Sequence, residues 1–274
     1  DMLQDYDDNI IRHTGTINRK RSSKIEWKYF QYLSLLFAER YLDRYFRDAK
    51  ALLTDLNEFL EPFNDQLNGW GVTPRDLLSH FTPESLRKLA FWNATGSGKT
   101  LLMHINILQY QHYLGKAGRT HDLNRIVVLT PNERLTVQHL EEFRAAGMPA
   151  AQFDKNRTVL PGEIDVIDMN KLREEGKKKT VSVDQFESNN LVLIDEGHRG
   201  AAGDVWSDMR RRLASEGFTF EYSATLGQAA AGTRDLTDEY AKSILFDYSY
   251  RFFYADGFGK DYTSLNIEDE AGTP

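Results

Sequence analysis

The spacing of apolar residues divides the chain into two parts. In roughly the first eighty residues, apolar side chains recur every three or four positions, which predicts amphipathic helices. Ser23 and Glu26 have capping-box spacing, and the helical pattern that follows them is expected to run to about Phe46. A second helical pattern covers residues 52–60, and Pro62 together with the turn residues Asn68–Gly71 is expected to mark its end.

From Lys88 onward, short apolar runs bounded by turn residues alternate with helical patterns. This alternation is typical of a parallel sheet with helical crossovers, and near-continuous apolarity suits strands that are covered on both faces. Strands are expected at Lys88–Trp92, Arg125–Leu129, Glu163–Ile167, Leu191–Ile194 and Phe218–Tyr222. The sequence therefore predicts an α/β fold with three parts: a helical segment over residues 1–86, a parallel-sheet domain over 87–245, and a tail or connector over 246–274.

The composition is that of a globular protein: 41% of the 274 residues are hydrophobic and 27% are charged. No apolar run approaches the roughly 18 residues of a membrane span. The absence of cysteine excludes disulfides and thiolate metal sites, and no leader-like stretch opens the chain, so we expect a cytoplasmic protein. A net charge of -7 argues against a uniformly basic nucleic-acid-binding module, although a local basic cleft stays compatible with it.

The segment after the first expected strand has the residue types of a phosphate-binding loop. It reads Asn93-Ala94-Thr95-Gly96-Ser97-Gly98-Lys99-Thr100. The glycines let backbone N–H groups face a phosphate, and the following helix N-terminus favours an anion. Lys99 is suited to the β- and γ-phosphates, and the Thr100 hydroxyl to Mg²⁺. Because Asn93 stands where such loops usually have their first glycine, a chance glycine-rich turn is the alternative.

Two adjacent carboxylates, Asp195 and Glu196, end the apolar run that begins at Leu191. After a phosphate loop, such a pair can divide its labour: Asp195 holds Mg²⁺, usually through water, and Glu196 accepts a proton from the attacking water. On its own, a strand that ends in two acids is most often structural. His198 is either an ordinary loop histidine or a link from the γ-phosphate to the next strand. ATP and Mg²⁺ are the expected cofactors.

Three motifs, each after an expected strand, together resemble a known family. Thr95–Thr100, Asp195–His198 and Ser223–Thr225 occur in the order of motifs I, II and III of superfamily 2 helicases and translocases. The resemblance implies a RecA-like P-loop NTPase domain, the first of two. Within the superfamily, the phosphate loop together with Asp-Glu-Gly-His-Arg is most similar to the motor (Res) subunit of type III restriction enzymes.

The same resemblance implies roles for residues outside the phosphate loop and the acid pair. Ser223 and Thr225 would couple hydrolysis to domain movement, by hydrogen bonds near His198 and Glu196. The alternative is a Ser-Ala-Thr turn that simply ends a strand. Gln31, within Lys28-Tyr29-Phe30-Gln31, resembles the adenine-reading glutamine of the family, although it lies unusually far upstream. A polar residue on a largely buried helix is the competing interpretation of Gln31.

Candidate nucleic-acid contacts follow from a further resemblance. Leu129–Arg134 is similar to motif Ia, so Thr130, Asn132 and Arg134 would contact backbone phosphates, which hold register without reading sequence. Asn170 and Lys171, which follow the expected strand Glu163–Ile167, are a second candidate of this kind. The alternative for these polar residues is helix capping.

The resemblance implies an ATP-dependent motor that moves on DNA, in a restriction or phage-defence enzyme. A second RecA-like domain is expected beyond Pro274, and methyltransferase or specificity subunits are candidate partners. Without the arginine of that second domain, the chain should bind ATP but hydrolyse it slowly. Two alternatives stay open: a strand-separating helicase on DNA or RNA, and a regulatory module that uses ATP as a switch and has no track.

Overall fold

The computed structural model describes residues 2–73, 76–154, 156–158, 160, 162–171, 186, 188–196 and 210–259. Seven strands form one sheet in the order β3-β4-β2-β5-β6-β1-β7, and every neighbouring pair is parallel. The strands are β1 (Lys88–Asn93), β2 (Ile126–Thr130), β3 (Ala150–Gln152), β4 (Ile164–Asp168), β5 (Leu191–Asp195), β6 (Phe218–Ser223) and β7 (Ile244–Tyr248). The expected parallel α/β fold is confirmed.

Helices follow most of the strands and also precede the sheet in the chain. They are α1 (Met2–Asn18), α2 (Tyr29–Gly69), α3 (Lys99–Lys116), α4 (Glu133–Ala146), α6 (Leu226–Ala230), α7 (Arg234–Ser243) and α8 (Tyr250–Ala255). Short 3₁₀ turns are η1 (Ser85–Arg87), η2 (Thr120–Asp122) and η3 (Met169–Lys171). Among the described helices, none is both long and apolar enough to cross a membrane.

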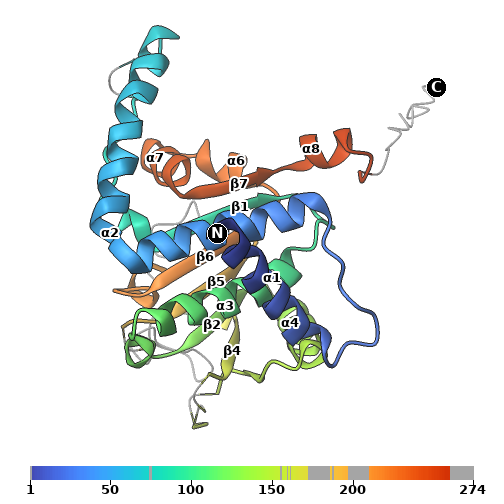
Figure 1. Ribbon diagram of the computed structural model, residues 1–274. Helices are drawn as coiled ribbons and strands as arrows, with labels where there is room; N and C mark the ends of the chain where they lie inside the picture. Colours follow the sequence, from blue (N-terminus) through green and yellow to red (C-terminus); the bar gives the residue numbers. More distant parts are fainter. Residues whose placement is uncertain are drawn as a thin grey trace, which may run out of the picture.

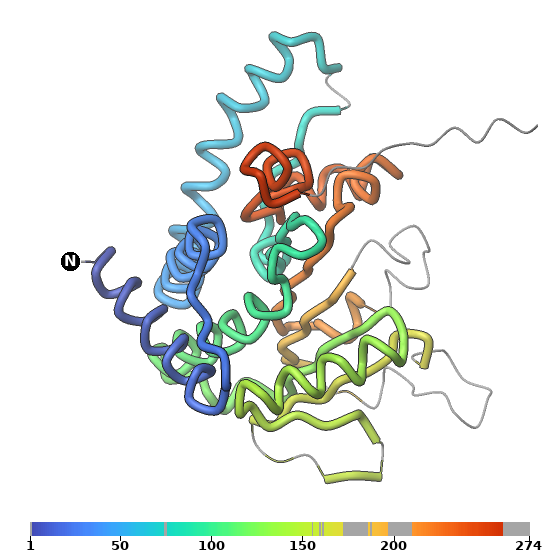
Figure 2. The backbone as a smooth tube through the Cα atoms, turned by 90° about the vertical axis from the view of Figure 1, so that its right-hand side faces the viewer, coloured from blue at the N-terminus to red at the C-terminus, as the bar shows by residue number. Residues whose placement is uncertain are grey.

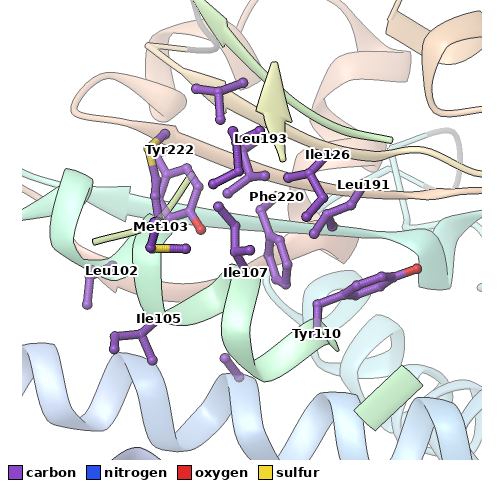
Figure 3. Packing of buried hydrophobic residues seen from close by; sticks show 14 of the residues in the cluster. Leu102, Met103, Ile105, Ile107, Tyr110, Ile126, Leu191, Leu193, Phe220 and Tyr222 are labelled. Carbon is purple, nitrogen blue, oxygen red and sulfur yellow. The ribbon is translucent and has the colours of Figure 1, made fainter. Parts of the chain in front are cut away.

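Alternate residues of each strand point to opposite faces of the sheet, and both faces are buried. The face that packs against α3 and α4 is formed by Leu89, Phe91, Ile126, Val128, Leu191, Leu193, Phe218, Phe220 and Tyr222. Figure 3 shows side chains of α3 meeting those of β2, β5 and β6 on this face. The opposite face carries two clusters, Val127, Leu129, Ile167, Val192 and Ile194 in one and Ala90, Leu226, Leu236 and Tyr240 in the other.

Helix α3 is enclosed, because α1 and α2 pack on it as a second helical layer (Figures 1 and 2). A chain of buried hydrogen bonds crosses these layers. The Tyr222 hydroxyl donates to Asn106 (2.6 Å), Asn106 donates to Gln109 (2.7 Å), and Gln109 donates to the Leu35 carbonyl (3.0 Å). This chain joins β6 through α3 to α2 and satisfies polar groups that burial would otherwise leave unpaired.

The long helix α2 differs from the two expected helices. It begins at Tyr29, so the expected start at Ser23 and Glu26 is wrong. Asp48 has non-helical angles (φ -157°, ψ 86°) and its carboxylate accepts from the Ala51 amide at 3.0 Å, so a kink joins two helical stretches. The second stretch continues through Pro62, so Pro62 does not end it, and it ends at Gly69, within the expected turn at Asn68–Gly71. This stretch projects away from the sheet (Figure 1).

The end of the described chain adds to the sheet. β7 pairs with β1 at the sheet edge, and α8 follows it. The Ala94 amide donates to the Tyr248 carbonyl at 2.9 Å, so β7 reaches the loop that follows β1. The tail that we expected to start at residue 246 therefore shares its first residues with a strand.

A group of charged side chains is buried around Glu221 of β6. Its carboxylate lies 2.8 Å from Lys88 Nζ and 3.1 Å from Arg210 Nη1, and it accepts from the Tyr240 hydroxyl. Burial alone would raise the pKa of Glu221, but Lys88 and Arg210 outweigh it and lower the pKa to about 2. Lys88 also contacts Glu239 at 2.5 Å. The ionised carboxylate is therefore held inside the fold by its cations.

Candidate nucleotide-binding site

The loop between β1 and α3 has the backbone shape that its glycines allow. Gly96 (φ 85°) and Gly98 (φ 92°) both lie in the left-handed region, and Gly98 immediately precedes α3. Residues with a side chain rarely adopt these backbone angles, so the loop requires glycine at both positions. The first turn of α3 begins at Lys99 and Thr100, and its free N–H groups make the helix N-terminus attractive to an anion.

Lys99 and Glu196 meet across the sheet. Lys99 Nζ lies 3.2 Å from Glu196 Oε1 and 3.5 Å from the carbonyl oxygen of Asn93. Lys99 follows β1 and Glu196 follows β5, and β6 lies between these two strands. Because the strands are parallel, all their carboxyl ends lie at the same end of the sheet. The structure therefore brings together a cation and a carboxylate that lie nearly a hundred residues apart in the chain.

Glu196 has a backbone conformation that is unusual for its residue type. Its φ is 54°, in the left-handed region, where residues other than glycine are uncommon. Such a conformation costs about 1–3 kcal/mol and is enriched at functional sites; Asn189 and Glu216 share it away from this site. It turns the chain at the end of β5 and places the Glu196 carboxylate over the loop that carries Lys99.

Asp195, the last residue of β5, is held by a residue that the sequence analysis missed. His139 Nε2 of α4 lies 2.9 Å from Asp195 Oδ2. His139 shares the buried face of α4 with Thr136 and Phe143. A histidine on the apolar face of an expected helix indicates a residue that needs a polar partner inside the fold. The sequence does not predict that this partner is Asp195.

Gln31 lies directly against the phosphate loop. Its Nε2 donates to the Ser97 carbonyl at 2.7 Å, and its Oε1 accepts from the Lys28 amide at 3.0 Å. A Cβ at Gly98 would lie 2.5 Å from Gln31 Nε2, so glycine at this position also makes room for the glutamine. The structure thus places residue 31 at the loop despite their separation in sequence.

Several polar groups of the loop are buried without a hydrogen-bond partner among the described residues. They are both side-chain polar atoms of Asn93, the Ser97 hydroxyl and, at the end of β6, the Thr225 hydroxyl. Unpaired buried groups are rare and call for an explanation, and a bound ligand or water supplies one. Together with the left-handed glycines, these groups fit a loop that completes its hydrogen bonds with phosphate.

The described residues also contain the ligand types that a magnesium nucleotide needs. No group of three or more His, Asp or Glu side chains among them could hold a metal unaided. Mg²⁺ bound with a nucleotide commonly takes only one or two protein ligands, and phosphate and water supply the rest. The Thr100 hydroxyl, in the first turn of α3, and the Asp195 carboxylate, at the end of β5, are of the types that suit that pattern.

The end of β6 is tied to the end of β1. The Ser223 hydroxyl accepts from the Thr225 amide at 3.1 Å, and Trp92 Nε1 donates to the Ala224 carbonyl at 3.0 Å. Ser223 is fully buried. The Ser-Ala-Thr turn is therefore fixed to the strand that leads into the phosphate loop. His198 and Gly197 lie outside the described residues.

The candidate nucleic-acid residues differ in the contacts that their side chains make. The Thr130 hydroxyl is buried and bonded to Thr136 Oγ1 (2.6 Å), and Asn132 caps α4 by accepting from the Leu135 amide (3.0 Å). Arg134 is exposed in the first turn of α4, and Lys171 Nζ lies 3.3 Å from Glu133. Thr130 and Asn132 therefore fix the start of α4, Arg134 presents its charge to solvent, and Lys171 is half-buried and paired with Glu133.

The family model described as type III restriction enzyme, res subunit, matches residues 52–228, which is more than half of the chain. The matched range contains the phosphate loop, both carboxylates and the turn after β6, whereas Gln31 precedes it. No curated protein matches the chain. The chain therefore belongs to the type III restriction enzyme res subunit family, and its parallel sheet is the RecA-like ATPase domain of a helicase-type motor.

Proposed function

We propose that the chain binds ATP with Mg²⁺, hydrolyses it, and couples the turnover to movement on DNA within a restriction or phage-defence enzyme. The contact of Lys99 Nζ with Glu196 Oε1, at 3.2 Å, carries the proposal. A phosphate-binding cation and an acid suited to activate water share one site at the carboxyl ends of the strands. Ligands bind at this edge in open parallel sheets.

Each residue of the site has a distinct part in the proposed reaction. The backbone amides around Gly96 and Gly98 bind phosphate oxygens, and Lys99 binds the β- and γ-phosphates. Thr100 and Asp195 would hold Mg²⁺, which when bound neutralises charge on the phosphates. Glu196 orients the attacking water and accepts its proton.

The ion pair between Lys99 and Glu196 gives the proposed cycle an ordered start. Without nucleotide, each side chain neutralises the other. When ATP binds, Lys99 exchanges the carboxylate for phosphate oxygens, and Glu196 becomes available to water. Glu196 then acts as a base only while Lys99 is bound to the phosphates of ATP. The carboxylate is therefore available to activate water only when the substrate is in place.

The proposed DNA contact lies at the start of α4. Arg134 is exposed there, and Lys171 lies beside the same turn through Glu133. Contacts to backbone phosphates at this position would hold the track without reading its sequence. Ser223 and Thr225 would pass hydrolysis on to a second RecA-like domain. That domain would contribute an arginine whose absence lowers hydrolysis by about 10³- to 10⁵-fold.

DNA is expected to raise ATP hydrolysis by the protein that unites this chain with its second RecA-like domain. The physical reason is that phosphate contacts at the start of α4 and closure of the two domains both favour the reactive arrangement. Phosphate release should be measured with duplex DNA, single-stranded DNA and RNA, and without nucleic acid. Displacement of a bound strand, followed separately, distinguishes strand separation from movement on a duplex.

Lys99→Ala is the matched inactive variant for this measurement. It should weaken ATP binding by about 10- to 100-fold, because a charge-assisted contact contributes about 1.5–3 kcal/mol. Lys116→Ala, at the other end of α3, should bind ATP like the parent. Hydrolysis that no nucleic acid changes would contradict the motor proposal and support an ATP-switched module instead.

Gln31→Ala should weaken ATP and GTP binding together, by about tenfold. Both ends of the Gln31 carboxamide are used by backbone groups, so its loss releases the Ser97 carbonyl and loosens the loop whichever base is bound. Equilibrium titration of each nucleotide separately, on parent and variant, measures this effect. Gln66→Ala, on the exposed part of α2, is the control. A loss confined to ATP would show instead that Gln31 reads adenine.

A further inference from the structure

His139 is bound to the aspartate of the site from outside the phosphate-binding motifs. Its side chain is buried, with 2% of the residue exposed, and Nε2 lies 2.9 Å from Asp195 Oδ2. An ionised carboxylate can only accept, so Nε2–H is the donor. Nδ1 has no hydrogen-bond partner among the described residues, so the bond to Asp195 is the polar contact that orients the ring.

The position of His139 is fixed by the helix that carries it. Phe143, one turn further along α4, packs beside the ring with a centroid distance of 6.3 Å. The start of α4 is fastened to the end of β2, where Thr130 and Thr136 share a hydrogen bond of 2.6 Å and Asn132 caps the helix. His139 therefore approaches Asp195 from one direction set by rigid elements.

We propose that His139 is a positioning residue for the metal-holding carboxylate of Asp195. Its hydrogen bond engages Oδ2 and sets the rotation of the carboxylate, which leaves Oδ1 to receive hydrated Mg²⁺. Partners that orient a metal-binding carboxylate typically change metal affinity or activity by about 10- to 100-fold when they are removed. The inference rests on the proposed function, because it assigns Asp195 to the magnesium of a bound nucleotide.

The test compares nucleotide binding with and without metal. Binding of a non-hydrolysable ATP analogue to this chain should be followed by calorimetry, in chelator and across a Mg²⁺ titration. His139→Leu removes the donor, and we expect it to raise the Mg²⁺ concentration for half-maximal effect by about 10- to 100-fold. Binding in chelator should stay as in the parent. His139→Gln, whose amide can donate to Asp195, should restore most of the Mg²⁺ response.

A second buried histidine supplies the control. His104 of α3 is fully buried, packs against Phe143 at 4.5 Å between ring centroids, and has no hydrogen-bond partner in the described part of the chain. His104→Leu should leave the Mg²⁺ response unchanged, although it alters the same apolar surroundings. If His139→Leu does not fold, His139→Phe keeps a ring without a donor and takes its place.

The outcomes separate this inference from the function on which it rests. A parent-like Mg²⁺ response in the donor-free variants would overturn the role of His139 and leave the ATPase proposal intact. An equal loss of binding in chelator and in Mg²⁺ would show that His139 only supports the fold, and would overturn it as well. If the parent itself binds the analogue without any response to Mg²⁺, the assignment of Asp195 to the magnesium of the nucleotide fails, and the role of His139 fails with it; a parent that does not bind the analogue at all would overturn the proposed nucleotide site.

Discussion

Glu196→Gln is expected to slow ATP hydrolysis by about 10²- to 10⁴-fold while ATP still binds. The carboxamide has the shape of the carboxylate but cannot accept the proton of the attacking water. It also removes the ion pair with Lys99 (3.2 Å), so Lys99 is available to phosphate from the start and binding should not weaken. Single-turnover hydrolysis and equilibrium binding of ATP, measured on the same preparation, check both halves of this expectation.

Glu216 offers a control of the same residue type and backbone region. Its φ is 57°, close to the 54° of Glu196, but it precedes β6 and so lies at the opposite edge of the parallel sheet. Glu216→Gln should hydrolyse ATP at the parent rate. Equal effects of the two substitutions would show that the loss is not specific to the Glu196 carboxylate, and the proposed base would have to be sought elsewhere.

Glu221→Gln is expected to lower the free energy of unfolding by about 3–5 kcal/mol. The carboxylate is buried between Lys88 Nζ (2.8 Å) and Arg210 Nη1 (3.1 Å), and the amide would leave two cations without their compensating charge. Chemical denaturation measures the loss. Glu239→Gln removes another partner of Lys88 at a partly exposed position, and it should cost no more than about 1 kcal/mol.

The same carboxylate predicts how stability depends on pH. Its pKa in the fold is about 2, below its ordinary value of 4.5, because Lys88 and Arg210 outweigh the effect of burial. The contribution is therefore fully present above the unfolded pKa and is lost as the pH falls from about 4.5 towards 2. The Gln variant should lack this part of the acid dependence. Parallel acid curves for parent and variant would contradict the ion-pair assignment.

The expected strands were found within one residue of their positions because each is buried on both faces, and most carry short apolar runs bounded by turn residues. In β6, apolar residues alternate with Thr219, Glu221 and Ser223, which are also buried. Two strands lacked this signal. β3 is a short run from Ala150 to Gln152, and β7 is an edge strand whose side chains are only partly buried. Helix limits were less predictable. Pro62 has no N–H to donate to a carbonyl in the preceding turn of α2, but it lies on an exposed stretch where water can donate to that carbonyl instead.

The sequence could predict those parts of the candidate site whose residues belong to a short motif. Lys99 and Glu196 could be paired in advance, because a phosphate loop and an acid pair at the ends of parallel strands meet at one edge. The contact of His139 with Asp195 depends on how α4 packs, and that of Gln31 with Ser97 depends on how α2 returns to the loop. Such tertiary contacts have no short-range pattern in the sequence.

The enclosure of α3 has a consequence for cooperativity. The helix that begins with Lys99 buries side chains against the sheet on one side and against α1 and α2 on the other. Removing residues 1–86 would uncover apolar surface and break the hydrogen bond between Gln109 and Leu35. We therefore expect the part of the helical segment that packs on α3 to unfold together with the sheet, and the nucleotide loop to lose its structure with them.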